Sequence, residues 1–358
     1  MKRKRLKSTR PTRKAAFVYV LFLTTAALGS GIGIYGTRAD NGPGEGTLSR
    51  IYRSVTSFFQ RPEDPTPVLA REYIYADSRL LAIDDAGSAG PPPADLAVWR
   101  PVSGTWWILG GGTGSTSAEN WGAEGDIPLQ GDFDGDGKTD LCVFRPSAST
   151  WWVMPSSVGS HYAVTFGALG DVPSPADFDG DGKTDIAVWR PSNGFWYILR
   201  SSDGVLGYRQ FGVAGDEPVP ADFDGDGLSD AAVWRPGNRT LYAVGSSDGR
   251  LSTSAFPEGS ADPVPADYDG DGKADPAARS GGDWIIRSSL TNTFSVSSWE
   301  QASDLAVPND FDGDGKVDIG VWRPRTGTWF IRNSSDGSSR TVQWGQAGDI
   351  PVPSLYRR

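Results

Sequence analysis

The sequence predicts an all-β fold, a β-propeller of four-stranded blades, and three observations support this prediction. A nine-residue Asp-rich stretch begins at Asp132, Asp177, Asp222, Asp267 and Asp310, with spacings of 45, 45, 45 and 43 residues. A period in this range indicates a stacked repeat architecture. The 46 Gly and 26 Pro residues exclude a helical repeat, and all 14 Trp residues lie within the repeat region.

Each unit is expected to form four short antiparallel strands, as residues 218–256 illustrate. Residues 218–222 predict a first strand with proline at its edge, and residues 230–236 predict a second strand after the Asp-rich loop. A turn then leads to a third strand at residues 240–244, and another turn leads to a fourth strand that ends near Phe256. Four strands in 45 residues are typical of a propeller blade, whereas a parallel β-helix needs shorter coils.

The two ends of the repeat array complement each other. The second-strand signature occurs six times, with Arg at positions 100, 145, 190, 235, 279 and 323. The first copy has no Asp-rich loop before it, and Gly348–Pro353 resembles a first strand with no second strand after it. We expect the strand beside Pro351 to join the blade containing Ala97 to Trp99, which closes six blades without an exposed edge. A hairpin predicted at Glu72–Ile83 would make seven blades if it joined the ring.

Charge and rare residues narrow the possible functions. The formal net charge is -10, and the first 14 residues carry eight Lys and Arg and no acid, so subtracting them leaves -18 for the rest. An acidic body argues against nucleic acid as a partner and for cations as ligands. The single Cys142 excludes an internal disulfide framework, and the single His161 excludes a His-based zinc site or a Ser-His-Asp triad.

The N-terminal residues 1–36 predict export. A basic segment, Met1–Lys14, precedes an uncharged run, Ala15–Gly36, which is long enough to span a bilayer. We predict a transmembrane signal anchor, with a cleaved signal peptide as the alternative. Both place the body outside the cytoplasm, at the cell surface or secreted, and the anchor would contact the membrane.

Three further segments follow this N-terminal region. Residues 37–66 are interpreted as a juxtamembrane segment and a Pro-rich linker. Within them, residues 48–59 have the spacing of an amphipathic helix, which would either lie on the membrane or pack on the body. Residues 67–90 contain the predicted β-hairpin, and residues 91–358 form the predicted propeller.

The Asp-rich loops carry a chelating pattern. Asp stands at positions 1, 3, 5 and 9 and Gly at positions 4 and 6, as in Asp177–Asp185. Carboxylates are hard oxygen ligands, and Gly permits the positive φ that folds a loop around an ion. With the backbone carbonyl of position 7 and water, five protein oxygens suit calcium, whereas magnesium would need a tighter octahedron. An EF-hand is excluded because position 12, where it needs Glu, is Val143 or Val188 in the first two loops.

We therefore predict about five calcium ions that substitute for the missing disulfides. The predicted ligands are Asp132, Asp134, Asp136, Lys138 and Asp140; Asp177, Asp179, Asp181, Lys183 and Asp185; Asp222, Asp224, Asp226, Leu228 and Asp230; Asp267, Asp269, Asp271, Lys273 and Asp275; and Asp310, Asp312, Asp314, Lys316 and Asp318. No catalytic or organic-cofactor residues are predicted.

The unit Ala-Asp-Phe-Asp-Gly-Asp-Gly-Lys-Thr-Asp-Ile-Ala-Val-Trp-Arg-Pro at residues 176–191 resembles the FG-GAP or VCBS repeat. The same family includes the calcium-loaded propeller of integrin α subunits. The resemblance covers about Pro91 to the C-terminus and implies calcium held by the four Asp of each loop, between the first and second strands of a blade. The copy at Asp275–Arg279 is one residue shorter and lacks the Trp, so we expect a distorted blade with an intact loop.

Aromatic and Arg residues recur in phase with the loops. We expect the recurring aromatic of the second strand to pack between blades, at Trp99, Phe144, Trp189, Trp234 and Trp322. Adjacent aromatics in Trp106-Trp107 and Trp151-Trp152 face opposite sides of a strand, which leaves one of each pair reachable by a ligand. The repeated Arg would pair with Asp of a neighbouring blade, at Asp126, Asp171, Asp216 or Asp349.

These observations favour a binding protein over an enzyme. Every unit stays within two residues of the period, so no unit carries the unique insertion that a catalytic site normally adds. We expect a non-enzymatic, extracytoplasmic, calcium-binding propeller that presents an adhesion-like surface to a protein or matrix partner. A carbohydrate-binding propeller is the alternative, and a polysaccharide-active enzyme is the least favoured interpretation.

Overall fold

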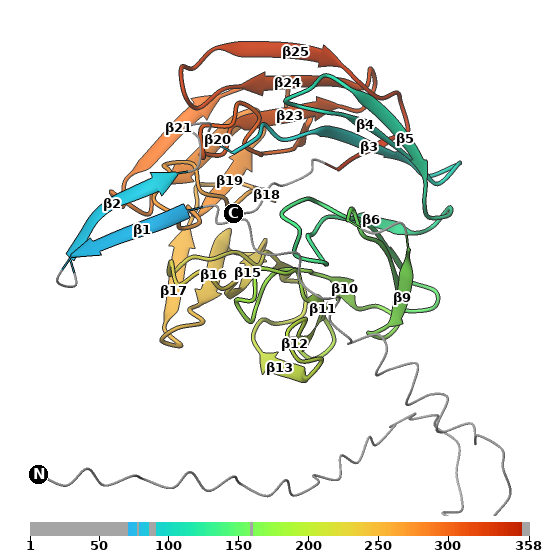
Figure 1. The fold of residues 1–358 in the computed structure, drawn as a ribbon, viewed down its shortest axis with the longest axis horizontal. Coiled ribbons are helices and arrows are strands. Elements are labelled where there is room, and N and C mark those ends of the chain that lie inside the picture. The colour runs from blue at the N-terminus through green and yellow to red at the C-terminus, as the bar shows by residue number, and fades with distance from the viewer. Residues whose placement is uncertain (1–70, 77–78, 86–90, 158–159, 353–358) are drawn as a thin grey trace, which may run out of the picture. The chain divides into compact units, whose positions relative to one another are not determined.

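The computed structural model describes residues 71–76, 79–85, 91–157 and 160–352. Within these residues, six four-stranded antiparallel sheets follow one another around a ring and form a six-bladed β-propeller (Figure 1). The predicted hairpin is a separate two-stranded sheet of β1 (Arg71–Ala76) and β2 (Arg79–Asp85), and no seventh four-stranded sheet occurs in the described part of the chain.

The six blades are numbered from the first Asp loop. Blade 1 comprises β6 (Ile127–Leu129), β7 (Leu141–Arg145), β8 (Thr150–Met154) and β9 (Tyr162–Thr165). Blade 2 comprises β10 (Val172–Pro173), β11 (Ile186–Arg190), β12 (Phe195–Leu199) and β13 (Leu206–Gln210). Blade 3 comprises β14 (Glu217–Pro218), β15 (Ala231–Arg235), β16 (Thr240–Val244) and β17 (Leu251–Ala255). Blade 4 comprises β18 (Asp262–Pro263), β19 (Ala277–Ser280), β20 (Asp283–Arg287) and β21 (Phe294–Ser298). Blade 5 comprises β22 (Leu305–Ala306), β23 (Ile319–Arg323), β24 (Thr328–Arg332) and β25 (Ser339–Gln343). Blade 6 comprises β26 (Ile350–Pro351), β3 (Leu96–Arg100), β4 (Thr105–Leu109) and β5 (Thr116–Asn120).

Blade 6 closes the ring from the two ends of the array. Ile350 pairs with Trp99 and Pro351 pairs with Val98, and the Val352 N–H donates to a carbonyl of β3 at 2.8 Å. The strand β26 thus takes the first position of a blade whose other three strands are β3, β4 and β5. The predicted closure and the count of six blades are confirmed, and β3 is left with no unpaired edge.

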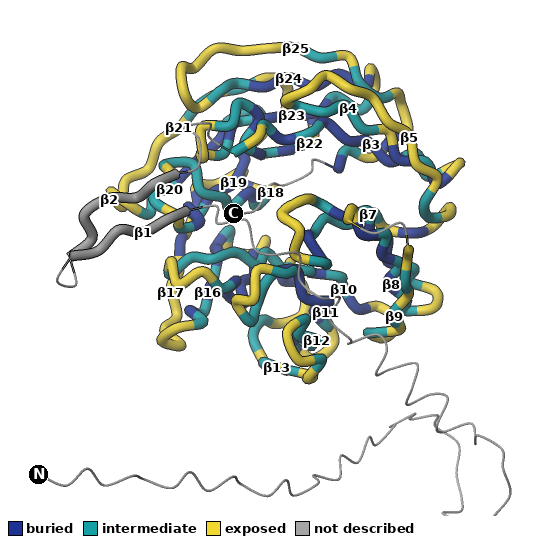
Figure 2. Tube along the Cα trace, in the orientation of Figure 1, coloured by how far each residue is buried: buried dark blue, intermediate teal, exposed yellow. Residues whose placement is uncertain are grey.

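The core lies between the blades, where second strands are buried on both faces. Figure 2 shows buried residues concentrated on the inner strands and exposed residues on the outermost ones. Trp189 of blade 2 packs with Val233 of blade 3, and Trp322 of blade 5 packs with Val98 of blade 6. The predicted interblade packing of the recurring aromatic is confirmed, because all five of these side chains are at most 1% exposed.

The second strand of blade 4 corrects the sequence interpretation. In blade 4, Arg279 pairs with Asp262, the first residue of the first strand. In blade 3, the residue that pairs with the first residue of the first strand is Trp234. The second strand therefore keeps its register, although β19 has four residues where β15 has five. Arg279 takes the position of the core Trp rather than that of the repeated Arg. The missing residues lie in the next turn, where Ser280 pairs with Asp283 across two residues.

Burial of Arg279 is compensated by backbone carbonyls. Its guanidinium is 0% exposed and donates to the carbonyls of Asp304 at 2.8 Å and Gly281 at 3.1 Å, while Nε has no partner. Burial lowers the pKa of this guanidinium. These carbonyls offset part of the cost of burying the guanidinium.

The repeated Arg does form ion pairs, but within a blade rather than between blades. Arg190 Nε lies 2.7 Å from Asp171, which precedes the first strand of the same blade, and its guanidinium lies 4.3 Å from the centre of the Tyr197 ring. The equivalent pairs are Arg100–Asp349, Arg145–Asp126, Arg235–Asp216 and Arg323–Asp304. These pairs hold the first strand to the second in every blade except blade 4, where Ser280 takes the position of the repeated Arg.

The predictions for residues 1–70 lie outside the described residues. Among the residues that are described, no helix is long and apolar enough to cross a membrane.

Truncation tests the closure of the ring. A chain that ends at Asp349 loses β26 and the buried Val352, so we expect the free energy of unfolding to fall by at least about 2 kcal/mol. A chain that ends at Val352 keeps the closing strand and serves as the control. Equal urea midpoints for the two truncated chains would contradict the closure.

Candidate metal centres

The Asp loops join the first and second strands of blades 1 to 5, and their first Asp organises the loop. In loop 2, Asp177 Oδ1 accepts the Gly180 N–H at 2.7 Å and Oδ2 accepts the Gly182 N–H at 3.0 Å. These glycines have φ of 77° and 82°, a region that favours Gly. The same two contacts recur in every loop, so the glycines turn the backbone around the first carboxylate.

The ninth residue of each loop is a buried Asp that fastens the loop to the blade. Asp185 Oδ2 accepts the Phe178 N–H at 2.8 Å, and Oδ1 accepts the Ser201 N–H at 2.7 Å. Ser201 belongs to the turn between the third and fourth strands, so one carboxylate holds two separate segments together. The equivalent residues are Asp140, Asp230, Asp275 and Asp318, each at most 1% exposed.

A pair of serines donates hydrogen bonds to the Asp residues at positions 3 and 5 of each loop. Ser201 Oγ donates to Asp181 at 2.9 Å, and Ser202 Oγ donates to Asp179 at 2.6 Å. Sequence reasoning missed these serines and treated their segment as a turn, although a Ser-Ser pair follows every loop. The other pairs are Ser156–Ser157, Ser246–Ser247, Ser288–Ser289 and Ser334–Ser335.

Blade 4 keeps both serine contacts although its turn is shifted by one residue. Ser289 Oγ donates to Asp271, the Asp at position 5 of this loop, at 2.8 Å. Leu290 stands where the second serine stands in the other blades, and its N–H donates to Asp269 at 3.2 Å. The missing hydroxyl contact to Asp269 is supplied by Ser288 at 2.5 Å. The contact is thus retained by a different residue.

Three Asp of each loop bring one carboxylate oxygen each to within 4.8 Å of the others. Positions 1, 3 and 5 converge in loops 1, 3 and 4, and positions 1, 3 and 9 converge in loops 2 and 5. The Asp that is not part of the triad stands at position 9 in loops 1, 3 and 4 and at position 5 in loops 2 and 5. The predicted role of the position 7 carbonyls, at Lys138, Lys183, Leu228, Lys273 and Lys316, stays a prediction.

The donor set fits a hard divalent cation. Every converging atom is a carboxylate oxygen, and the loops contain no His or Cys that would favour a softer metal. In loop 2, Asp179 Oδ1 is buried and has no hydrogen-bond partner, which a bound cation would satisfy. Calcium takes six to eight oxygens in flexible geometry, so the five triads could each hold one calcium ion.

Burial and neighbouring carboxylates oppose ionisation of these sites without a metal. Burial, with the charge of Asp134 nearby, raises the pKa of Asp140 to about 7. Burial likewise raises the pKa of Asp185 and of Asp318 to about 6. Backbone N–H donors partly offset the effect. A divalent cation would favour the ionised carboxylates and so remove this cost.

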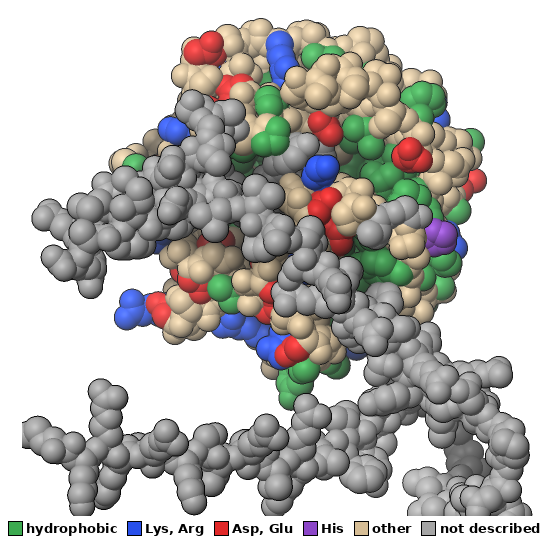
Figure 3. Space-filling view, in the orientation of Figure 1, with side chains coloured by type: hydrophobic (Ala, Val, Ile, Leu, Met, Phe, Trp, Pro, Cys, Tyr) green, Lys and Arg blue, Asp and Glu red, His purple; other side chains and the backbone are tan. Residues whose placement is uncertain are grey.

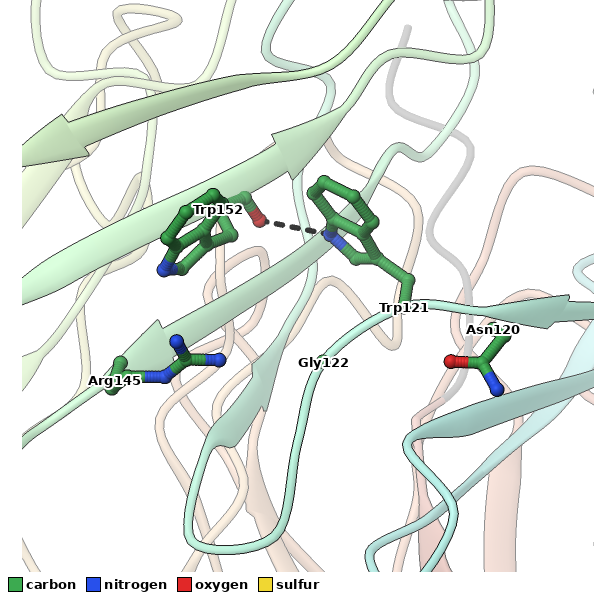
Figure 4. Close-up of a pocket in the computed structure, with 5 residues that line it drawn as sticks. All are labelled: Asn120, Trp121, Gly122, Arg145 and Trp152. Atoms are coloured by element: carbon green, nitrogen blue, oxygen red, sulfur yellow. Dashed lines mark hydrogen bonds between the residues drawn. The ribbon is translucent and has the colours of Figure 1, made fainter.

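The opposite end of the ring carries a pocket between blades 6 and 1. We call the end with the Asp loops the loop end, and the end with the Arg–Asp pairs the arginine end. The pocket has a volume of about 250 Å³ and is lined by Asn120, Trp121, Gly122, Arg145 and Trp152. Figure 4 shows Trp121 of one blade donating its indole N–H to the Trp152 carbonyl of the next, at 3.1 Å.

Each adjacent Trp pair has one buried and one accessible member, as predicted. Trp106 and Trp151 are at most 2% exposed and belong to the core. Trp107 is 37% exposed, with the Arg100 guanidinium 5.3 Å from its ring centre, and Trp152 lines the pocket.

Comparisons identify the repeat and the fold. A family model described as an FG-GAP-like repeat matches residues 132–188, 177–233 and 222–276. The structure is similar to TolB from Acinetobacter baumannii, with a TM-score of 0.55, 16% identity, and coverage of 74% of this chain and 67% of that chain. It is also similar to a chain of a nidogen/laminin complex, with a TM-score of 0.52, 9% identity, and coverage of 73% and 97%.

A third structure is more distant. A lectin from Agrocybe aegerita that recognises terminal N-acetylglucosamine has a TM-score of 0.47, 16% identity, and coverage of 72% and 77%. A search of curated proteins found no match. At these identities the likenesses to TolB and to the nidogen/laminin chain show the fold alone.

Removing one serine pair tests the metal centres. In Ser201→Ala/Ser202→Ala we expect one ion to bind about 10- to 100-fold more weakly, because the serine hydroxyls that hydrogen-bond to the Asp ligands orient them. Calcium titration calorimetry of the full chain in mild detergent would count the tight sites. Ser192→Ala, at the other end of the same blade, should leave the count unchanged, and five equally tight ions in the double variant would contradict the assignment.

The raised carboxyl pKa values predict an unusual pH dependence for the calcium-free chain. Folded Asp140, Asp185 and Asp318 bind protons at a pH where unfolded Asp, with a pKa near 4, does not. The free energy of unfolding in chelator should therefore rise as the pH falls from about 8 to about 5. Urea denaturation would measure it. With saturating calcium the trend should reverse, and a chelated chain that loses stability over this range would contradict the prediction.

Proposed function

Since residues 132–276 consist of FG-GAP-like repeats, we propose that the chain is a non-enzymatic, calcium-binding propeller that presents an interaction surface outside the cytoplasm. Calcium is available there at millimolar concentration. An ion held about tenfold more tightly than this contributes roughly 1.4 kcal/mol to stability. Export is supported by the basic and uncharged N-terminal sequence, and the need for ions is supported by a single cysteine, which is buried and free.

The observation that carries the proposal is the different composition of the two ends of the ring. At the loop end, loop N–H groups and serine hydroxyls hold the carboxylates in place, and the converging carboxylate oxygens suit a structural metal. The innermost strands surround the centre of the ring (Figure 1), and their first residues lie at the arginine end. In blade order these residues are Ile127, Val172, Glu217, Asp262, Leu305 and Ile350.

These six positions form an apolar arc and an acidic arc. Ile127, Leu305 and Ile350 belong to the consecutive blades 5, 6 and 1 and are 38% to 47% exposed. Glu217 and Asp262 are exposed on the adjacent blades 3 and 4. Burial and the charge of Asp262 raise the pKa of Glu217, so this acidic pair would gain from a cation. Of these two acids, only Asp262 lies near the buried Arg279, whose guanidinium is 3.7 Å from the Asp262 carboxylate.

Such a surface fits a protein segment with a Lys or Arg beside an apolar side chain. The cation would lie against Glu217 and Asp262, and the apolar group would cover the arc of Ile127, Leu305 and Ile350. Nucleic acid fits poorly: Figure 3 shows charges of both signs scattered over the visible described surface, without a continuous basic area. Catalysis is not part of the proposal, because the clustered acids repeat in every loop and already have partners.

Carbohydrate binding is a second candidate because of the pocket at the blade 6 and blade 1 interface. Sugar rings stack on accessible aromatic faces, and Trp152 and Trp107 offer such faces near Asn120 or an Arg. This candidate uses the arginine end as well, but it involves the clefts between blades rather than the centre of the ring.

Charge reversal distinguishes the two candidates. The full chain in calcium is tested on a peptide library and on a glycan array. For the protein surface, Glu217→Lys/Asp262→Lys should weaken binding of peptides with Lys or Arg beside an apolar residue by about tenfold or more, because attraction becomes repulsion. Glu119→Lys/Glu124→Lys makes the same change in net charge at other exposed positions and should bind normally.

The carbohydrate-binding candidate predicts a different result. Glycan binding that is lost in Trp107→Ala or Trp152→Ala, and unaffected by the charge reversal, would favour the carbohydrate-binding propeller. Peptide binding that is unchanged in the charge reversal would contradict the proposed protein surface. Circular dichroism and the melting temperature in calcium would show that each variant is folded.

A further inference from the structure

Neighbouring Asp loops are joined by hydrogen bonds between their backbones. In each case the N–H at position 8 of one loop donates to the carbonyl of the first Asp in the preceding loop. The pairs are Thr184 to Asp132, Ser229 to Asp177 and Ala274 to Asp222, all at 2.6 Å, and Val317 to Asp267 at 2.8 Å. Position 8 lies between the position 7 carbonyl and the ninth Asp. Each bond therefore connects the ligand-bearing backbones of two candidate metal centres.

A side-chain contact accompanies these hydrogen bonds. The position 7 side chain of one loop covers the position 4 glycine of the preceding loop: a Cβ on Gly135 would lie 2.9 Å from Lys183 Cε, and one on Gly225 would lie 2.6 Å from Lys273 Cε. Lys273 Nζ also donates to the Asp224 carbonyl at 2.9 Å. The turn that folds one loop around its first carboxylate is thus covered by the next loop.

The series of loops ends at blade 6, which has no Asp loop. Its Ala94 N–H donates to the Asp310 carbonyl of loop 5 at 2.7 Å, as position 8 does elsewhere. Asp95 accepts the Gly111 N–H at 2.8 Å, as the ninth Asp does elsewhere. The other carboxylates are missing, and Pro91–Pro93 precede Ala94. Loop 3 therefore has a candidate metal centre on each side, whereas loop 5 has one only on the side of loop 4.

We propose that ion binding is positively coupled between neighbouring loops through these hydrogen bonds; the inference rests on the proposed calcium-binding function. An ion that draws the carboxylates of one loop together also orders that loop's backbone. The ordered backbone fixes a hydrogen-bond partner and a covering side chain for its neighbour, so the neighbour loses less conformational entropy when it binds. Couplings of this kind change affinity by about five-fold or more.

Removing one centre at a time tests the coupling. Asp224→Asn/Asp226→Asn disables the middle loop, and Asp312→Asn/Asp314→Asn disables the end loop. Both leave positions 1, 8 and 9 intact. In calcium titration calorimetry of the full chain we expect a Hill coefficient above 1 for the unmodified chain. Each variant should lose one ion, and the middle variant should weaken the remaining four by about five-fold or more, well beyond the end variant.

A second variant removes one connecting hydrogen bond without touching a carboxylate. Ser229→Pro deletes the N–H that donates to Asp177, whereas Ser229→Ala keeps it, and Ala274 stands at this position in loop 4. The Pro variant should bind its ions more weakly and with a lower Hill coefficient than the Ala variant. If the Pro variant does not fold, the two loop variants decide the question.

The outcomes separate this inference from the proposed function. Five ions that bind with a Hill coefficient of 1, and remaining sites of equal affinity in both loop variants, would overturn the coupling but not the calcium-binding function. A chain that binds no calcium and melts at the same temperature in calcium and in chelator would overturn both.

Discussion

Each blade of this propeller buries its second strand only by packing against the next blade. Trp189 reaches Val233 and Trp322 reaches Val98. A second-strand aromatic packs in the same way in every blade except blade 4, where Arg279 takes its place. A blade alone would expose both faces of a strand that is apolar throughout, so stability accumulates only when the ring is closed. The pairing of β26 with β3, which completes blade 6, is therefore the contact on which all six interfaces between blades depend.

The ninth Asp of each loop connects this packing to the candidate metal centres. Asp185 directly precedes the buried strand β11, and its two oxygens hold the loop and the serine turn. A buried carboxylate with these contacts resists removal because its N–H partners would lose their acceptor. Blade 6 shows that this role is separate from metal binding, since Asp95 keeps the contact to Gly111 without an Asp loop.

Much of the fold and the outline of the site follow from periodicity in the sequence. The blade count, the closure at Pro351 and the buried aromatics could all be predicted from signatures that recur about every 45 residues. The serine pairs escaped notice because a Ser-rich turn is ordinary by itself, and only tertiary contact shows which carboxylates it touches. Arg279 was misplaced because spacing alone cannot tell whether a missing residue is lost from a strand or from the turn after it, and the register settles this.

The separation of the two ends means that residues at one end of the ring can vary while the Asp loops at the other end keep their contacts. Loop-end carboxylates are constrained in every blade, because each one accepts backbone or serine donors and tolerates little change. The first residues of the innermost strands contribute little to these contacts, and here they diverge from Ile127 to Glu217 and Asp262 while the strand pairing is retained. Variation at the arginine end thus changes the surface at the centre of the ring without disturbing the hydrogen bonds of the Asp loops.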